Sequence, residues 1–387
     1  MNQKTVHILF SLLRSAIFDT RLTDRERAEL TSERLSELIK LSKTHDVSHL
    51  LALGLKKNEL VPKQSVGAEK SIFTAIYRFE QLEHECENLF GALETAQIPF
   101  LPLKGAIMRR YYPEAWMRTS CDVDVLIHRE NLESAIAYLV QNLNYVENER
   151  ATHDVSLLTP CGICVELHFD LVEEGRANNA ITVLSSVWEH AALRENYNYW
   201  YEMSDAFFYF YHIAHMAKHF ETGGCGVRPF IDLFILDRIV GANEDARNEL
   251  LERGNLLQFS RVARQLSEAW FGEDGDEDPL VLKMQNFILQ GGVYGSADNR
   301  VALQQQRRGG RIGYIFSRIF LPYAKLKRYY PILEKHRWLM PFMQIRRWFM
   351  LLRPDVAKMA RRELKANSNI EKSRADEMSE LLEHIGL

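Results

Sequence analysis

The chain has 387 residues, of which 46% are hydrophobic, 26% charged and 11% aromatic, and its net charge is −4. This composition is typical of a globular protein and excludes disordered, collagen-like and small disulfide-stabilised proteins. The near-neutral total conceals an uneven distribution of charge. Residues 300–365 contain 17 Lys or Arg and 3 Asp or Glu, a balance of +14, whereas the rest contains 31 against 49, a balance of −18. The strongly basic C-terminal part therefore needs an explanation of its own.

The N-terminal part of the chain is predicted to be helical. Residues 1–95 have apolar residues at helical spacing and few glycines or prolines, a pattern that predicts about four helices. A short apolar run with prolines, residues 98–103, predicts a strand. Residues 104–111 then predict a helix. We therefore expect a helical region over 1–95 and a different domain after it.

The next part alternates in a way that predicts a small sheet. Residues 122–127 alternate acidic and apolar residues with period two, which predicts a strand with one acidic face. Residues 130–143 predict a helix whose Leu132, Ile136, Leu139 and Val140 are directed inward. Two further strands, about 154–159 and 162–169, flank Pro160-Cys161-Gly162 and predict a hairpin.

The remaining residues are predicted to be mostly helical, and together these patterns predict four regions. These are a helical N-terminal region (1–95), an α/β core (96–178), a helical region that packs on the core (179–272) and a basic helical C-terminal region (279–387). The acidic, glycine-containing segment 273–278 is expected to link the last two. The predicted fold class is α+β, a small mixed sheet between helical flanks.

Three acidic residues of the predicted sheet are candidates for a metal site. Asp122 and Asp124 lie two apart on one strand, so their side chains share a face. On a later strand Glu166 and His168 share a face with Cys164. If the two strands are neighbours, the three carboxylates converge, and divalent cations would relieve their repulsion. The alternative is that such a pair of aspartates is simply exposed on a strand or turn.

The order of these motifs resembles a known family. Leu103-Lys104-Gly105 is followed by Arg118-x-x-Cys121-Asp122-Val123-Asp124 and then by Val165-Glu166-Leu167-His168. This arrangement resembles the uncharacterised nucleotidyltransferase family of the DNA polymerase β superfamily, whose members are typically bacterial. In place of the glycine-serine pair that is usual in the wider superfamily, this chain has Lys104-Gly105.

The resemblance implies roles for several residues. Asp122 and Asp124 would bridge two Mg²⁺ ions, with Mn²⁺ as a substitute, and Glu166 would hold the catalytic ion near the acceptor. Lys104 and Gly105 would meet the triphosphate of a nucleotide such as ATP. Arg118 would either clamp a phosphate or form a structural ion pair. His168 would orient Glu166 or contact the substrate.

A histidine-containing segment follows the predicted core. His212, His215 and His219 share one face of a predicted helix, and a zinc site is the weaker interpretation because no accompanying Glu or Cys is in register. A cleft-facing role in substrate binding for His215 and His219, with Arg228 and Asp232 nearby, is the stronger functional interpretation. Packing at a helix interface is the structural alternative.

The basic region alternates positive charges with bulky apolar residues between positions 307 and 362. Three interpretations are open: a helical module that faces an acidic part of the same chain, a surface that docks on an anionic membrane, and a surface that binds RNA. No nucleic-acid-binding motif supports the third, so nucleic acid is not expected as a partner.

The leading hypothesis is a Mg²⁺-dependent transferase that moves a nucleoside monophosphate from an NTP to an unidentified acceptor. One alternative is a catalytically degenerate protein that binds a nucleotide or a partner. The other is a peripheral-membrane assembly factor that acts through its basic region. The chain has five scattered cysteines and no apolar stretch of 18 residues, which predicts a cytoplasmic location. Peripheral attachment to the inner face of the membrane is the alternative location.

Overall fold

The computed structural model describes residues 2–60, 66–172, 179–239, 244–272, 278–293, 295, 297–350 and 372–387. The chain divides into two compact units. The first unit comprises residues 1–217, 227–286 and 386. The second comprises residues 218–226, 287–385 and 387. No described helix is both long and apolar enough to cross a membrane.

In the described part of residues 2–95 the first unit has five helices, where about four were predicted. They are α1 (Gln3–Phe18), α2 (Asp24–Ala28), α3 (Ser32–Thr44), α4 (Ser48–Lys57) and α5 (Val66–Thr95). The short α2 forms because Thr23 and Glu26 make a capping box, a local signal that the apolar periodicity does not contain. Helices α1 and α4 approach closely at Gly54, where a Cβ would lie 2.2 Å from the carbonyl oxygen of Leu12.

A five-stranded mixed sheet follows, with strand order β1-β2-β5-β4-β3. The strands are β1 (Phe100–Pro102), β2 (Asp122–Ile127), β3 (Val146–Arg150), β4 (Asp154–Leu158) and β5 (Cys164–His168). The pair β2–β5 is parallel and the other pairs are antiparallel. The predicted strand over 122–127 and the predicted hairpin are confirmed. Strand β3 was missed because all its residues are exposed, so no apolar alternation marks it.

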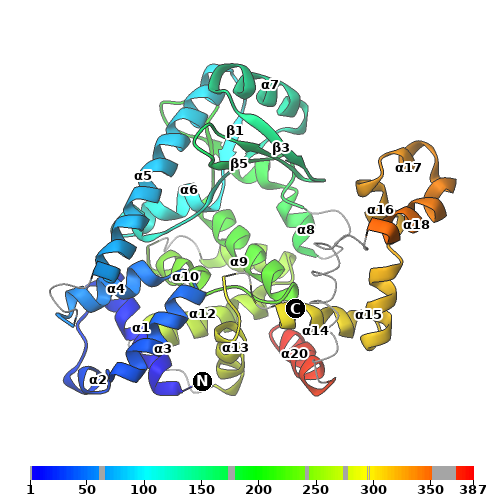
Figure 1. The fold of residues 1–387 in the computed structure, drawn as a ribbon. Coiled ribbons are helices and arrows are strands. Elements are labelled where there is room, and N and C mark those ends of the chain that lie inside the picture. The colour runs from blue at the N-terminus through cyan, green and yellow to red at the C-terminus, as the bar shows by residue number, and fades with distance from the viewer. Residues whose placement is uncertain are drawn as a thin grey trace. The chain divides into compact units, whose positions relative to one another are not determined.

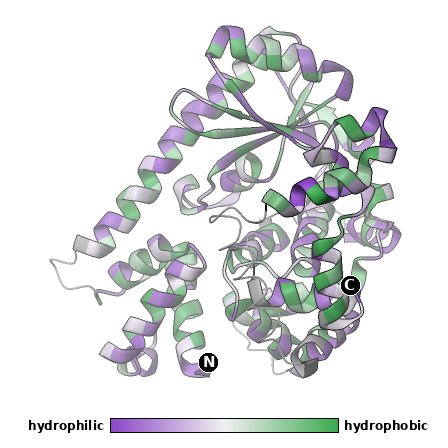
Figure 2. Cartoon of the chain, turned by 45° about the vertical axis from the view of Figure 1, so that its right-hand side comes forward, coloured by the Kyte–Doolittle hydropathy of each residue, from purple (hydrophilic) through white to green (hydrophobic). Residues whose placement is uncertain are grey.

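Two helices cover one face of this sheet, as Figure 1 shows for α5 and for α7 (Leu132–Leu143). The apolar residues of β2 and β5 point to this side and form the core with both helices. Leu132, Ile136 and Leu139 are buried there as predicted, but Val140 is 40% exposed, so the prediction for Val140 was wrong. Figure 2 shows green and purple segments alternating along α5, because its residues turn between the core and the solvent.

Short elements complete the core. Helix α6 (Lys104–Met108) and the 3₁₀ turns η1 (Arg109–Tyr111) and η2 (Ala115–Met117) connect β1 to β2, and η3 (Arg129–Asn131) precedes α7. The segment after the core, predicted to be mostly helical, also contains two strands that were not predicted. Helix α8 (Asn179–Leu184) and the 3₁₀ turn η4 (Val187–His190) come first. They are followed by an antiparallel hairpin of β6 (Ala191–Leu193) and β7 (Tyr201–Met203).

The helices that follow are α9 (Asp205–Glu221), α10 (Arg228–Ile239), α11 (Glu244–Arg253), α12 (Leu257–Phe271) and α13 (Pro279–Leu289). Of the expected acidic linker 273–278, residues 273–277 lie outside the described residues.

The second unit is helical where it is described. It contains α14 (Ala297–Arg307), α15 (Gly310–Ile319), α16 (Tyr323–Tyr329), α17 (Ile332–Lys335), the 3₁₀ turn η5 (Arg337–Leu339), α18 (Met340–Met350) and α20 (Lys372–His384). A small core of Leu321, Leu326 and Leu333 joins α16, α17, η5 and α18, with tyrosine and methionine side chains around it.

Candidate metal and nucleotide site

The face of the sheet opposite the core carries the acidic residues. In the parallel ladder between β2 and β5, Asp124 lies directly opposite Glu166, and Val123 lies opposite Val165. Because successive side chains of a strand point to opposite faces, the valines enter the core and the carboxylates project to the other side. The two strands therefore bring together two acidic residues that are far apart in the sequence.

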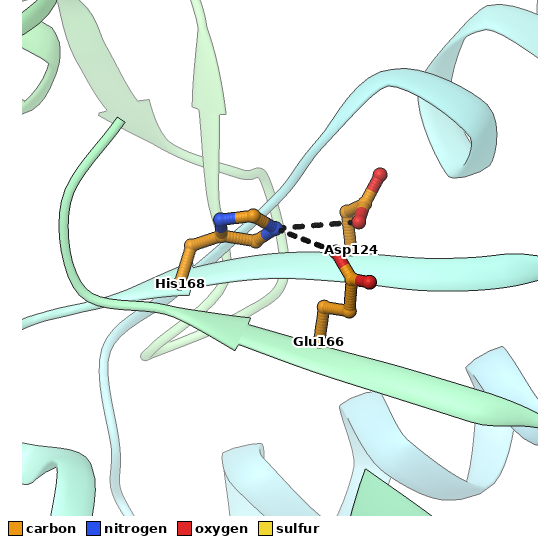
Figure 3. A group of neighbouring side chains, drawn as sticks. All are labelled: Asp124, Glu166 and His168. Atoms are coloured by element: carbon orange, nitrogen blue, oxygen red, sulfur yellow. Dashed lines mark hydrogen bonds and ion pairs between the residues drawn. The ribbon is translucent and has the colours of Figure 1, made fainter. Parts of the chain in front are cut away.

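His168 joins these two carboxylates. Its Nε2 atom lies 3.3 Å from Oδ1 of Asp124 and 3.4 Å from Oε2 of Glu166 (Figure 3). One ligand atom from each of the three residues lies within 4.8 Å of the others. Among the described residues this is a group that could hold a metal ion. It includes His168, for which the sequence suggested orientation of Glu166 or contact with the substrate.

Asp122 lies at the margin of this group. It starts β2, opposite Cys164, and its side chain shares the face of Asp124. Burial raises the pKa of Asp122, and the neighbouring charges of Asp124 and Glu166 raise it further. Asp122 therefore places a third carboxyl group next to the pair, although it is outside the set of ligand atoms within 4.8 Å.

Lys104 supplies a positive charge beside the carboxylates. Its Nζ atom lies 3.8 Å from Oδ2 of Asp124. Burial by itself would lower the pKa of Lys104, but interactions with Tyr211 and the carboxylates outweigh it and raise that pKa. Lys104 is also the first residue of α6 and has a φ of 22°, which few residues with a side chain adopt. The strand-to-helix turn thus holds an ammonium group at the carboxylates.

The protonation states follow from these contacts. Burial would raise the pKa of Asp124, but Lys104 and His168 outweigh it and hold that pKa below its usual range. Burial would lower the pKa of His168, but its hydrogen bonds to Asp124 and Glu166 raise it to about 9. Asp124 is therefore ionised and His168 protonated at neutral pH. A cation that bound Nε2 of His168 would have to replace its proton.

Gly105 lies where a side chain would not fit easily. A Cβ on Gly105 would lie 3.1 Å from Nη1 of Arg118 and 3.3 Å from Oγ of Ser120. Arg109 fixes the same turn, because it donates hydrogen bonds of 3.0 Å to the Gly105 carbonyl and to Ser120. Close packing under the turn therefore explains this glycine without a bound nucleotide.

Arg118 forms the structural ion pair that was one of its two expected roles. Its Nη2 atom lies 3.0 Å from Oδ2 of Asp232 on α10, and the hydroxyl of Tyr112 donates to Oδ1 of Asp232 at 2.7 Å. All three side chains are largely shielded from solvent. This network ties the loop before β2 to α10, which is how Asp232 takes part in the site region.

Arg228 contacts the same loop from the start of α10. Its Nη1 atom donates to the carbonyl oxygen of Thr119 at 2.5 Å and lies 3.6 Å from Oδ2 of Asp46. Asp46 in turn accepts a hydrogen bond of 3.2 Å from the Thr119 hydroxyl. Arg228 therefore supports the loop that leads into Asp122.

The three histidines of α9 have different surroundings. His212 is paired through Nε2 with the carbonyl oxygen of Pro229 at 2.9 Å. His215 belongs to the first unit and lies 6.4 Å from the ring of Tyr211, centroid to centroid, whereas His219 belongs to the second unit. None of the three is in the Asp124–Glu166–His168 group.

Tyr211 on α9 is a residue of the site that was not predicted from the sequence. It interacts with the ammonium of Lys104, and burial raises the pKa of its hydroxyl to about 12, so the hydroxyl is neutral. No local signal marks Tyr211, because its place beside Lys104 depends on how α9 packs against the sheet. Tyr112 was not predicted either, because its hydrogen bond to Asp232 depends on how α10 packs against the loop before β2.

The donor atoms of the site fit a divalent cation. Two carboxylates suit Mg²⁺ or Mn²⁺, and an imidazole nitrogen is a better ligand for Mn²⁺ or Zn²⁺ than for Mg²⁺. Asp124 and Glu166 would hold the ion, with the Asp122 carboxyl group beside them and His168 as a third ligand or as a hydrogen-bond donor.

Comparisons with known proteins add one positive result. The model of a family described as uncharacterised nucleotidyltransferase matches residues 31–272, which is more than half of the chain. The match includes the sheet, the turn at Lys104 and the helices that carry Tyr211 and Asp232. No curated protein and no solved structure matches the chain.

Proposed function

The chain belongs to the uncharacterised nucleotidyltransferase family, and we propose that it transfers a nucleoside monophosphate from an NTP to an acceptor hydroxyl. The observation that carries this proposal is the pairing of Asp124 with Glu166 on adjacent parallel strands, with His168 and Lys104 beside them. Carboxylates on one face of a sheet, beside a cationic turn, are suited to a metal-bound triphosphate.

The proposed reaction is a displacement at the α-phosphorus. The acceptor oxygen forms a bond to that phosphorus, the bond from phosphorus to the oxygen that bridges to the β-phosphate breaks, and pyrophosphate leaves with the electron pair. The acceptor proton passes to a base. A bound Mg²⁺ or Mn²⁺ would neutralise charge on the triphosphate and position it.

The chain's own residues would bind and orient the reactants. Asp124 and Glu166 would hold the cation, and Asp122 would hold a second one. The ammonium of Lys104 would contact the triphosphate oxygens once the nucleotide competes with Asp124 for it. Tyr211 would keep Lys104 in place. Glu166 is only partly buried, so its carboxylate is also the group that could accept the acceptor proton.

A labelling experiment tests this proposal. The wild-type protein, Mg²⁺ or Mn²⁺ and each α-labelled NTP are incubated in a lysate of the host cell, and labelled products are separated. We expect label from one NTP in a discrete product, no label with Asp124→Asn, and normal label with the control Glu149→Gln, an exposed residue of β3. If no NTP labels any product with either cation, the proposal is wrong.

A second candidate is a nucleotide-binding protein without turnover. It is favoured by one observation: His168 and Lys104 already compensate the charge of Asp124. This candidate predicts that NTP raises the melting temperature while no pyrophosphate is released in the same lysate. Pyrophosphate release that depends on Asp124 excludes it.

A further inference from the structure

Exposed apolar side chains gather on helices α15 to α18 of the second unit. We use the name aromatic-basic surface for these apolar residues and the exposed basic residues among them: Ile312, Phe316, Ile319, Phe320, Lys335, Arg337, Trp338, Phe342, Ile345, Arg346 and Phe349. Single exposed apolar residues are common, but a cluster of this kind marks an interaction surface.

Two helices each present one apolar stripe to solvent. On α15, Ile312, Phe316 and Ile319 follow helical spacing, and on α18, Phe342 and Phe349 do the same. Phe316 and Phe342 are each 58% exposed, and Phe349 is 68% exposed. Each stripe is therefore directed away from the small core of this part, and not into it.

The surface is held in place by a small core and by contacts among its rings: Phe316 stacks on Phe320, Phe320 meets Trp348 edge-on, and Trp338 meets Phe342 edge-on. Leu321, Leu326 and Leu333 fill the local core. The indole nitrogen of Trp348 donates to the carbonyl oxygen of Ile319 at 2.9 Å, which ties α18 to α15. The phenylalanines keep more than half of their surface exposed, so they can contact a partner while the leucine core maintains the local fold.

The charge of this segment is almost entirely positive. Residues 300–350 contain 12 Lys or Arg and one acidic residue, Glu334. Arg337 lies 4.6 Å from the ring centre of Tyr323, and Arg346 lies 5.6 Å from that of Tyr330. Their guanidinium groups thus lie over aromatic rings at the edge of the apolar stripes.

We propose that the aromatic-basic surface binds the surface of a lipid bilayer that contains anionic headgroups. Lys and Arg would contact the headgroups while the apolar stripes enter the boundary between headgroups and acyl chains, where Trp and Phe are favourable. Each basic residue near an anionic membrane contributes about 1 kcal/mol. The protein would lie on the membrane and not span it.

The same features disfavour two other partners. If a second copy of the chain bound here, the positive charges of the two copies would face each other. Residues 300–350 of each copy contain one acidic residue to offset them. Single-stranded nucleic acid binds through aromatic stacking and basic grooves, but the isoleucines at positions 312, 319 and 345 offer bases no stacking surface. Both aliphatic and aromatic side chains are found on the apolar faces of helices that lie on membranes.

Vesicle flotation with the full-length protein tests the proposal. One set of vesicles contains phosphatidylcholine and phosphatidylglycerol in equal parts, and the other contains phosphatidylcholine alone. We expect the protein to float with the first set and to remain in solution with the second. Added salt should weaken the binding, because screening reduces the attraction to the headgroups.

Two variants separate the apolar and the charged contributions. The double variant Phe342→Ser/Phe349→Ser removes two exposed rings, and Lys335→Gln/Arg337→Gln removes two charges; each neutralised charge should weaken binding about five-fold. The matched control is Phe73→Ser on α5, whose side chain is 69% exposed in the first unit. It should bind like the wild type.

Several outcomes would overturn the proposal. These are no flotation of the wild type with anionic vesicles, equal flotation with both vesicle sets, or unchanged binding by both double variants. Binding to single-stranded RNA in the absence of vesicle binding would identify a nucleic-acid surface instead. A stable dimer in sedimentation that is lost in the Phe342→Ser/Phe349→Ser variant would identify a second copy as the partner.

Discussion

The ammonium of Lys104 lies 3.8 Å from the carboxylate of Asp124, so the candidate metal ligand already has a positive partner within the chain. Lys104 comes from the turn into α6 and Asp124 from β2, which pairs with the strand before that turn. This ion pair connects the binding of the two ligands. A metal ion would compete with Lys104 for the carboxylate of Asp124, and a triphosphate would compete with Asp124 for the ammonium of Lys104. Mutation of either residue therefore separates the two binding events.

Asp124→Asn should weaken Mn²⁺ binding by about ten- to a hundred-fold, because it removes one ionised ligand and leaves the side-chain volume unchanged. Isothermal titration calorimetry with Mn²⁺ measures the loss. The control Glu149→Gln changes an exposed carboxylate on β3 and should bind like the wild type. Equal affinity in Asp124→Asn and the wild type would show that Asp124 is not a ligand.

Lys104→Met should have opposite effects on the two ligands. Without the ammonium beside Asp124, Mn²⁺ binding should become at least about five-fold tighter, because about 1–4 kcal/mol of charge repulsion is removed. Binding of a non-hydrolysable NTP analogue should weaken about ten-fold, since a charged contact to phosphate is lost. The control Lys40→Met alters an exposed lysine of α3. A parallel change for both ligands would contradict the proposed role of Lys104.

Asp232→Asn should reduce the free energy of unfolding by about 3–5 kcal/mol at neutral pH, because it leaves the buried Arg118 without its partner. Urea unfolding monitored by circular dichroism measures the loss. The exposed substitution Glu114→Gln should cost nothing measurable and serves as the control. An unaltered unfolding free energy in Asp232→Asn would show that the ion pair does not hold the loop to α10.

The cost of Asp232→Asn should also depend on pH. Burial would raise the pKa of Asp232, but Arg118 and its other partners outweigh it and lower that pKa below the unfolded value. The folded state of the wild type then loses this stabilisation as the pH falls below the unfolded value and through the folded pKa. The difference between wild type and variant should therefore shrink in acid. A constant difference would contradict this assignment.

Two glycine substitutions should change stability in opposite directions. Gly54→Ala should lower the melting temperature, because its Cβ would lie 2.2 Å from the carbonyl oxygen of Leu12 and would push α1 and α4 apart. Gly91→Ala on α5 has no atom within 4 Å of the new Cβ and should gain about 0.5–1 kcal/mol from helix propensity. Equal shifts in the two variants would show that the α1–α4 contact is not tight.

Much of the candidate site was predictable from local patterns. The alternation at 122–127 determines that Asp122 and Asp124 share one face, and the glycine turn after Pro160 predicts the hairpin that carries Glu166 and His168. The α+β class followed from the change of period after residue 95. These predictions succeeded because side-chain direction along a strand depends only on the backbone of that strand.

The sequence by itself determined which side chains share a face, but only the tertiary structure decided which ones meet. Glu166 faces Asp124 because β5 pairs with β2 in a parallel register, and Arg118 meets Asp232, 114 residues later, because α10 packs on the loop before β2. Strand β3 and the β6–β7 hairpin carry no clear pattern and form because neighbouring strands offer partners for their backbone groups. Which strands pair and which distant residues meet depends on long-range packing, and a local sequence pattern does not contain that information.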